Sequence, residues 1–276
     1  MSAFSIHKIK RYFAESFLIG ILSTLLIAGC NTHGLMTVSD GRATAPITLT
    51  VSAAASLQDA LEAIAPQFSA AHPNIAVAYN FGASGALQQQ IEQGAPADVF
   101  FPAATNQMNA LADKGLILSS SRQALLTNSL VLIAPIASSL NITDLSQLET
   151  ADISHFAVGE FRSVPAGQYA EQAFKQLALL DSLQSKFVFG NTVRSVLAAV
   201  GSGNAELGMV YVSDAQLSDQ VKVLVTVPPG AHPPIVYPIA ALKSTPHPAA
   251  AQTFINFLTT EMAQATFQAF GFDPGE

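Results

Sequence analysis

Hydrophobic and polar positions follow two alternating patterns from Pro46 onward. Segments such as 47–53 and 75–81 are rich in β-branched and other apolar residues and predict strands, whereas 57–70 carries apolar residues at helical spacing. The other predicted strands are 98–101, 129–133, 156–158, 187–189, 207–211, 221–227 and 236–242. The other predicted helices are 86–93, 106–113, 166–180, 193–200, a short one from Ser213, 249–259 and 261–270. This alternation predicts an α/β fold with mostly parallel sheets flanked by helices.

The N-terminal segment has a different pattern. Residues 1–29 combine a basic start with a short apolar run over 17–28, which predicts a signal peptide and is too short for a comfortable membrane span. The run ends in Leu-Ile-Ala-Gly before Cys30 and resembles a bacterial lipobox, so Cys30 is predicted to be lipidated. A plain secretory signal with an incidental cysteine is the alternative. Residues 30–45 are small, polar and aperiodic, and predict a flexible tether.

Composition limits the possible functions. The chain has 276 residues, of which 50% are hydrophobic and 11% are charged, so it can form one large or two modest cores. A net charge of −7 argues against a nucleic-acid partner and gives no long-range attraction to an anion. The single cysteine excludes an intrachain disulfide, and the six histidines show no metal-ligand spacing.

Four short apolar runs lead directly into predicted helix starts, at 51–57, 79–85, 163–167 and 189–193. A helix start leaves backbone N–H groups without intrahelical partners at the positive end of the helix dipole. Several such starts directed at one point can hold an anion without Lys or Arg. The pattern therefore predicts a site for a small oxyanion.

In the first half of the chain, two serines are the candidate ligands. Ser56 lies at a strand-to-helix turn, where the alternative role is an N-cap in a capping-box-like pair with Asp59. Ser84 lies between Gly82 and Gly85, where backbone can approach a ligand closely, and the alternative is a simple turn.

In the second half, the candidates are backbone groups and one tyrosine. A proline at position 165 suits the first turn of a helix and leaves the next N–H, at Ala166, free. Thr192 is predicted as an N-cap that leaves the N–H of Val193 free. Tyr211 ends an apolar strand, where ligand clefts open in α/β sheets, although such a residue is often a core aromatic. Two arginines, Arg162 and Arg194, flank these loops and could also be ligands.

In these segments the chain resembles the molybdate-binding proteins of bacterial ABC importers. The resemblance runs from about Ile47 to the C-terminus. The matching motifs are AAASL at 53–57, GAPADVF at 94–100, NSLV at 128–131, VPAGQYA at 164–170, VR at 193–194, LGMVYVSDA at 207–215 and FGF at 270–272.

The resemblance implies a two-lobed periplasmic-binding-protein fold with a tetrahedral oxyanion between the lobes. It implies that Ser56 and Ser84 bind through hydroxyl and backbone groups, Ala166 and Val193 through backbone N–H, and Tyr211 through its hydroxyl. Molybdenum would thus be held only as its oxyanion. Because the family binds this ion without a cationic side chain, salt-bridged or solvated roles are favoured for the two arginines. The expected domains are 46–127 and 227–276 for one lobe and 128–226 for the other, joined by a hinge.

We therefore expect an exported, lipid-anchored monomer that captures molybdate, and also tungstate, for the membrane permease of an ABC importer. No enzyme activity, cofactor or nucleic-acid partner is expected. The alternatives are a binder of another oxyanion, such as sulfate or phosphate, and an enzyme acting on a phosphorylated substrate. The enzyme would need a base or metal at the cleft, and the nearest carboxylates (Asp59, Glu160 and Asp214) show no paired spacing.

Overall fold

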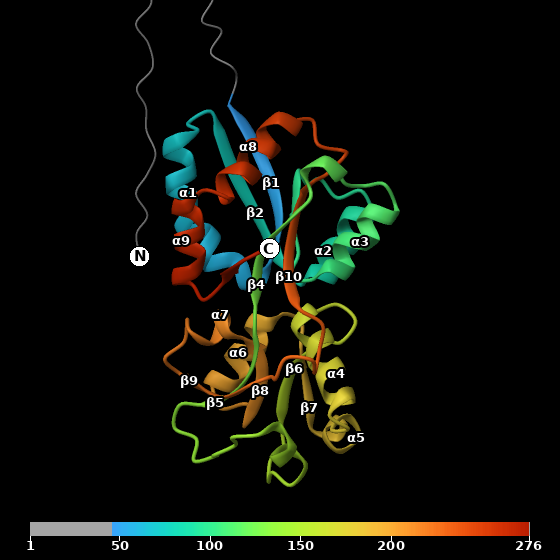
Figure 1. Cartoon of the computed structure of the whole chain (residues 1–276), viewed down its shortest axis with the longest axis vertical. Helices are drawn as coiled ribbons and strands as arrows, with labels where there is room; N and C mark the ends of the chain where they lie inside the picture. Colours follow the sequence, from blue (N-terminus) through green and yellow to red (C-terminus); the bar gives the residue numbers. More distant parts are fainter. Residues whose placement is uncertain (1–45, 276) are drawn as a thin grey trace, which may run out of the picture. The chain divides into compact units, whose positions relative to one another are not determined.

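The computed structural model describes residues 46–275. The predicted signal peptide, Cys30 and the tether lie outside the described residues. The described chain forms two lobes, each built on one β-sheet with helices against it (Figure 1). This arrangement confirms the prediction of a two-lobed α/β fold.

Lobe 1 is built on a six-stranded sheet with the order β11-β4-β10-β3-β1-β2. Its strands are β1 (Ile47–Ala54), β2 (Ile75–Gly82), β3 (Val99–Phe101), β4 (Gln123–Asn128), β10 (Ile235–Ala241) and β11 (Asp273–Pro274). Its helical elements are η1 (Ala55–Leu57), α1 (Gln58–Ala71), α2 (Ser84–Glu92), α3 (Thr105–Asp113), η2 (Ser119–Ser121), α8 (Pro248–Leu258) and α9 (Glu261–Ala269).

Helix α1 shows how the helical pattern becomes packing in lobe 1. The apolar residues Leu61, Ile64 and Phe68 recur on one face of the helix, and all three are fully buried. The Phe68 ring meets Phe254 and Phe257 of α8 edge-on at centroid distances of 5.2 Å. Helices α1, α8 and α9 thus share one core, while α2 and α3 lie together on the other side of the sheet (Figure 1).

Lobe 2 is built on a five-stranded sheet with the order β7-β6-β8-β5-β9. Its strands are β5 (Leu130–Pro135), β6 (Phe156–Gly159), β7 (Phe187–Gly190), β8 (Leu207–Tyr211) and β9 (Val221–Thr226). Its helical elements are η3 (Leu145–Glu149), α4 (Pro165–Gln176), α5 (Leu180–Leu183), η4 (Gln184–Lys186), α6 (Val193–Gly201) and α7 (Val212–Ala215).

Both sheets are mixed, which corrects the prediction that they would be mostly parallel. Strands β1, β2 and β3 are parallel, but β10 pairs antiparallel with both β3 and β4. In lobe 2, β6 is parallel to β7 and β8, whereas β5 is antiparallel to β8 and β9. Every antiparallel pair includes a strand that comes directly before or after a change of lobe, that is β4 or β5 at the first change and β9 or β10 at the second. A strand that reaches its partner by way of the other lobe needs no crossover helix.

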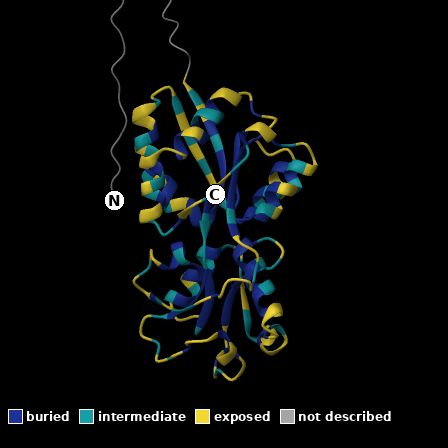
Figure 2. Cartoon of the chain, in the orientation of Figure 1, coloured by how far each residue is buried: buried dark blue, intermediate teal, exposed yellow. Residues whose placement is uncertain are grey.

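Buried residues concentrate on the inner strands of both sheets, whereas the edge strands β2, β7 and β11 have none, and the buried residues continue into the region where the lobes meet (Figure 2). The central strand of lobe 2, β8, is buried along its whole length. The polar groups at the junction of the lobes are therefore held by well-packed elements on both sides. Among residues 46–275, no helix is long and apolar enough to cross a bilayer.

Candidate functional site

One cavity lies where helix starts from both lobes meet. Its lining consists of Ala54, Ala55, Ser56, Gly82, Ala83, Ser84, Ala103, Val164, Pro165, Ala166, Val193 and Tyr211. The structure thus brings together all five residues that the sequence analysis named as ligands. The cavity has about 210 Å³ of space, including the part that opens to solvent. The volume that the centre of a water molecule can reach is only about 10 Å³. Pockets for organic ligands usually measure roughly 300–1,000 Å³, so this cavity suits a much smaller species.

Three backbone N–H groups in the lining lie at helix starts. Ser84 is the first residue of α2, Ala166 the second of α4 and Val193 the first of α6. No intrahelical acceptor exists for these positions, and among the described residues none of the three N–H groups donates a hydrogen bond. All three helices have at least nine residues, so each contributes the positive end of a dipole.

Local sequence explains why α6 and α4 begin at the cavity. Thr192 caps α6: its Oγ1 accepts from the N–H of Ser195 at 3.1 Å, and Ser195 Oγ accepts from the N–H of Thr192 at 3.1 Å. The cap confirms the predicted role of Thr192 and leaves the Val193 N–H unused. Helix α4 begins with a proline, as predicted, and Gly167 in its first turn lies against the end of β6. A Cβ at Gly167 would lie 2.0 Å from the carbonyl oxygen of Gly159, so only glycine allows this approach.

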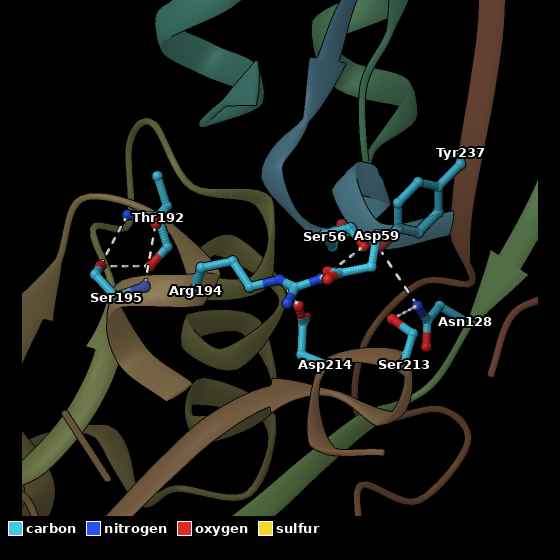
Figure 3. A network of polar contacts seen from close by, with 9 residues as sticks. All are labelled: Ser56, Asp59, Asn128, Thr192, Arg194, Ser195, Ser213, Asp214 and Tyr237. Carbon is cyan, nitrogen blue, oxygen red and sulfur yellow. Dashed lines mark hydrogen bonds and ion pairs between the residues drawn. The ribbon is translucent and has the colours of Figure 1, made fainter. Parts of the chain in front are cut away.

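Ser56 does not have the capping role that was its alternative. It lies in η1, and the N-cap of α1 is Leu57, which makes no side-chain capping bond. Instead, Ser56 Oγ lies 3.0 Å from the hydroxyl of Tyr237 on β10 (Figure 3). The alternative of a capping-box pair with Asp59 was therefore wrong: Ser56 pairs with Tyr237 and Asp59 pairs with Arg194, both far away in the sequence.

Ser84 also has a partner within lobe 1. Its hydroxyl oxygen accepts a hydrogen bond from the backbone N–H of Ala103 at 3.0 Å, and the residue is fully buried. Because a backbone N–H can only donate, the Ser84 hydroxyl must direct its own proton elsewhere. The cavity is the open space beside it.

Tyr211 ends β8 in the cavity lining with 1% of its surface exposed. Burial raises the pKa of its hydroxyl well above the usual value, and the neighbouring Tyr237 adds to the effect. The hydroxyl therefore keeps its proton, yet it makes no hydrogen bond of good geometry among the described residues, although the Tyr237 hydroxyl lies near it. A buried polar group without a partner is costly, by about 1–3 kcal/mol, so its presence in a cavity lining points to a ligand that pairs with it.

Charged side chains lie beside the cavity but do not line it. Arg194 of α6 pairs with Asp59 of lobe 1 at 2.5 Å, and its Nε lies 2.9 Å from Oδ1 of the fully buried Asp214, without the alignment of a hydrogen bond (Figure 3). Arg162 pairs with Glu160, and its side chain is 92% exposed. Both arginines thus have the salt-bridged role that the sequence analysis favoured.

The two lobes also touch directly around the cavity. The N–H of Gly85 in α2 donates to the carbonyl of Ser163 at 2.9 Å, and Gln107 of α3 donates to Gln168 of α4 at 3.1 Å. A Cβ at Gly85 would lie 2.8 Å from both Cα and O of Ser163. These contacts join segments that are far apart in the chain and enclose the cavity between the lobes.

Residues 49–273 match the family described as bacterial extracellular solute-binding proteins. The chain belongs to this family. It is 39% identical over 228 residues to the molybdate-binding protein ModA of Escherichia coli, a match that covers 81% of this chain and 88% of that protein. It is also 39% identical over 263 residues to YvgL of Bacillus subtilis, provisionally named as an ABC transporter substrate-binding lipoprotein, with 95% and 98% covered.

Among solved structures, this solute-binding protein resembles the periplasmic molybdate-binding protein of Azotobacter vinelandii. The TM-score is 0.74 and the sequences are 28% identical, with 81% of this chain and 98% of that chain covered. The likeness extends over both lobes.

Two residues at the site of this solute-binding protein were missed by the sequence analysis. Tyr237 and Asn128 belong to β10 and β4, and they contact Ser56 or each other rather than the cavity. Asn128 was named only as part of the NSLV motif, and Tyr237 lay only within a predicted strand, so neither was assigned a role at the site. The one local signal at Tyr237 is the proline that follows it, because proline in a strand interior marks a bulge.

Proposed function

We propose that this solute-binding protein captures molybdate and delivers it to the membrane permease of an ABC importer. The observation that carries the proposal is the chemistry of the cavity lining, which offers N–H and O–H groups and contains no charged side chain. The relatives named as molybdate-binding proteins support the same ligand. The protein is thus a transport binding protein rather than an enzyme.

In the proposed complex, donors from both lobes surround one tetrahedral dianion. Ser56 and Ser84 bind it through their hydroxyl and N–H groups, Ala166 and Val193 through N–H, and Tyr211 through its hydroxyl. The negative charge is balanced by the positive ends of α2, α4 and α6 and not by an arginine. The ion satisfies the Tyr211 hydroxyl, which otherwise has no partner among residues 46–275.

Donor matching gives the site its proposed selectivity. Molybdate near neutral pH carries no proton and needs only donors, whereas phosphate usually carries a proton that needs an acceptor. Leaving that proton unpaired in a buried site costs about 1–3 kcal/mol. Sulfate is also a bare dianion, so its exclusion depends on the size of the cavity. Tungstate matches molybdate in charge and shape and is proposed as a second ligand.

Calorimetric titration with molybdate, tungstate, sulfate and phosphate tests the proposal. We expect tight binding of the first two ions and weaker binding of the others. Tighter binding of sulfate or phosphate than of molybdate would assign the protein to another oxyanion.

We further propose that the protein is an exported monomer that is anchored to the membrane by a lipid on Cys30. Support comes from the lipobox-like segment and from the Bacillus subtilis relative, which is named as a lipoprotein. Cys30→Ser should release the protein into the soluble fraction without changing its affinity for molybdate. An unmodified Cys30 in mass spectra of the membrane-bound protein would contradict the anchor.

A further inference from the structure

Behind Ser56 lies a chain of polar groups that does not itself line the cavity. It begins at Asn128, the last residue of β4. The Oδ1 atom of Asn128 accepts a hydrogen bond from the N–H of Ser129 at 2.8 Å. Because the backbone N–H is a donor, it fixes the amide with its oxygen on that side. The amide nitrogen then faces Ser213 Oγ at 2.8 Å and the Tyr237 hydroxyl at 3.4 Å (Figure 3).

The fixed amide sets the direction of the hydrogen bonds that follow. Asn128 Nδ2 can only donate, so the oxygen of Tyr237 accepts from it. The proton of Tyr237 is then free for a neighbouring hydroxyl. Ser56 Oγ, at 3.0 Å, has the geometry of a hydrogen-bond partner, whereas the nearby Tyr211 hydroxyl does not. With that proton on its oxygen, Ser56 must direct its own proton away from Tyr237. The cavity lies on its open side.

Tyr237 is suited to this role by its burial and by the shape of β10. The residue is fully buried, and burial raises the pKa of its hydroxyl well above the usual value, so it remains a donor near neutral pH. The register of β10 against β4 shifts between Tyr237 and Pro238. Proline has no N–H for the sheet, and a bulge at this point changes the direction of the neighbouring side chain.

We propose that Tyr237, oriented by Asn128, is a positioning residue that keeps the Ser56 hydroxyl a hydrogen-bond donor toward the cavity and thereby favours fully deprotonated oxyanions over protonated ones. The inference rests on the proposed function, since it assigns selectivity to the same cavity. It makes Ser56 equivalent to Ser84, whose oxygen is occupied by the N–H of Ala103. Both serines then offer a proton to the ion and no lone pair.

Tyr237→Phe tests the proposal because it keeps the buried ring and removes only the donor. The Ser56 oxygen is then free to accept the proton of hydrogen phosphate. The dissociation constants for molybdate, sulfate and monoprotonated phosphate are measured by calorimetry. We expect the preference for the bare dianions over hydrogen phosphate to fall by about threefold to tenfold. The matched control is Tyr79→Phe, which removes a hydroxyl bonded to the Leu61 carbonyl in the same lobe and should leave the preference unchanged.

A double-mutant cycle separates positioning from general loosening of the lobe. If Tyr237 acts through Ser56, Tyr237→Phe should not alter the preference further in a Ser56→Ala background. An unchanged preference in the single variant, or an equal change with and without Ser56, would overturn the proposal. Should Tyr237→Phe fail to fold, Asn128→Ala provides the same measurement, with a smaller shift in the same direction.

The same titrations distinguish failure of this inference from failure of the proposed function. A wild-type protein that binds sulfate but not molybdate would overturn the proposed function. The ratio of sulfate to hydrogen phosphate would then still decide the role of Tyr237. A wild-type protein that binds none of the oxyanions would overturn both.

Discussion

The two lobes contribute different kinds of donor to the cavity. Lobe 1 contributes the side-chain hydroxyls of Ser56 and Ser84, whose oxygens each have a hydrogen-bond partner behind them, and one helix-start N–H group, that of Ser84. Lobe 2 contributes the backbone N–H groups of Ala166 and Val193 and the Tyr211 hydroxyl, which has no partner among the described residues.

The difference shows two ways of fixing a donor in space. A backbone N–H at a helix start is oriented by the helix itself, so it needs no supporting side chain. A hydroxyl rotates, and it presents its proton in one direction only if another donor occupies its oxygen. The hydroxyls of lobe 1 therefore depend on residues outside the cavity lining, whereas the N–H groups of lobe 2 depend only on where α4 and α6 begin.

The largest effect is expected when a backbone donor of lobe 2 is removed. Val193→Pro deletes the N–H at the first position of α6, where proline is compatible with a helix, and it places a ring carbon at the cavity. A hydrogen bond to a charged group contributes about 1.5–3 kcal/mol, and the ring adds a steric penalty. We expect the dissociation constant for molybdate to rise by about a hundredfold or more.

The matched control for this change is Val193→Ala, which retains the N–H. Its affinity for molybdate should stay within a few-fold of the wild type, and circular dichroism should show that both variants keep their helices. If the alanine variant loses as much affinity as the proline variant, the side chain rather than the N–H is the determinant in lobe 2.

Next in size is the effect of removing the unpartnered hydroxyl. Tyr211→Phe should raise the dissociation constant for molybdate roughly tenfold to a hundredfold, because one hydrogen bond to a charged ion is lost. Calorimetry checks the affinity, and thermal unfolding checks that the fold is intact. Arg194→Ala should cost much less molybdate affinity, since Arg194 does not line the cavity and is engaged by the carboxylates of Asp59 and Asp214. A silent Tyr211→Phe beside an Arg194→Ala that abolishes binding would mean that charge holds the anion.

The same contrast explains how much could be predicted from sequence. Helix starts and apolar periodicity are local, so the helix that follows Thr192 and the strand that ends at Tyr211 were predicted within one residue. The strand β4 was missed, because it is short, has polar ends and is defined by its pairing with β10, more than a hundred residues away. The partner of Ser56 was missed for a similar reason: Tyr237 lies 181 residues away.

A smaller effect is expected where the lobes meet through backbone alone. Gly85→Ala puts a Cβ 2.8 Å from the Ser163 backbone, which must move for the lobes to approach. Such overpacking typically costs about 1–3 kcal/mol, so we expect molybdate affinity to fall by about tenfold. Because the proposed donors come from both lobes, binding of molybdate should close the lobes and compact the wild type. Small-angle scattering should show that the variant compacts less when molybdate is added. Equal compaction in the two proteins would show that this contact does not limit closure.

The last prediction concerns stability rather than affinity and rests on a comparison of one carboxylate from each lobe. Asp59 of lobe 1 is half-exposed, whereas Asp214 of lobe 2 is fully buried, and burial raises the pKa of Asp214 from 3.8 to about 7 although Arg194 opposes the shift. Below about pH 4 both the folded and unfolded states hold this proton, but between about pH 4 and 7 only the folded state keeps it. The contribution of Asp214 to the free energy of unfolding should therefore fall as the pH rises through this window. Asp214→Asn removes the titrating group while retaining its shape, so its melting temperature should decline less than that of the wild type between pH 4 and 7 in calorimetric scans. Parallel declines in the two proteins would mean that Asp214 is already ionised at low pH, stabilised by its pairing with Arg194.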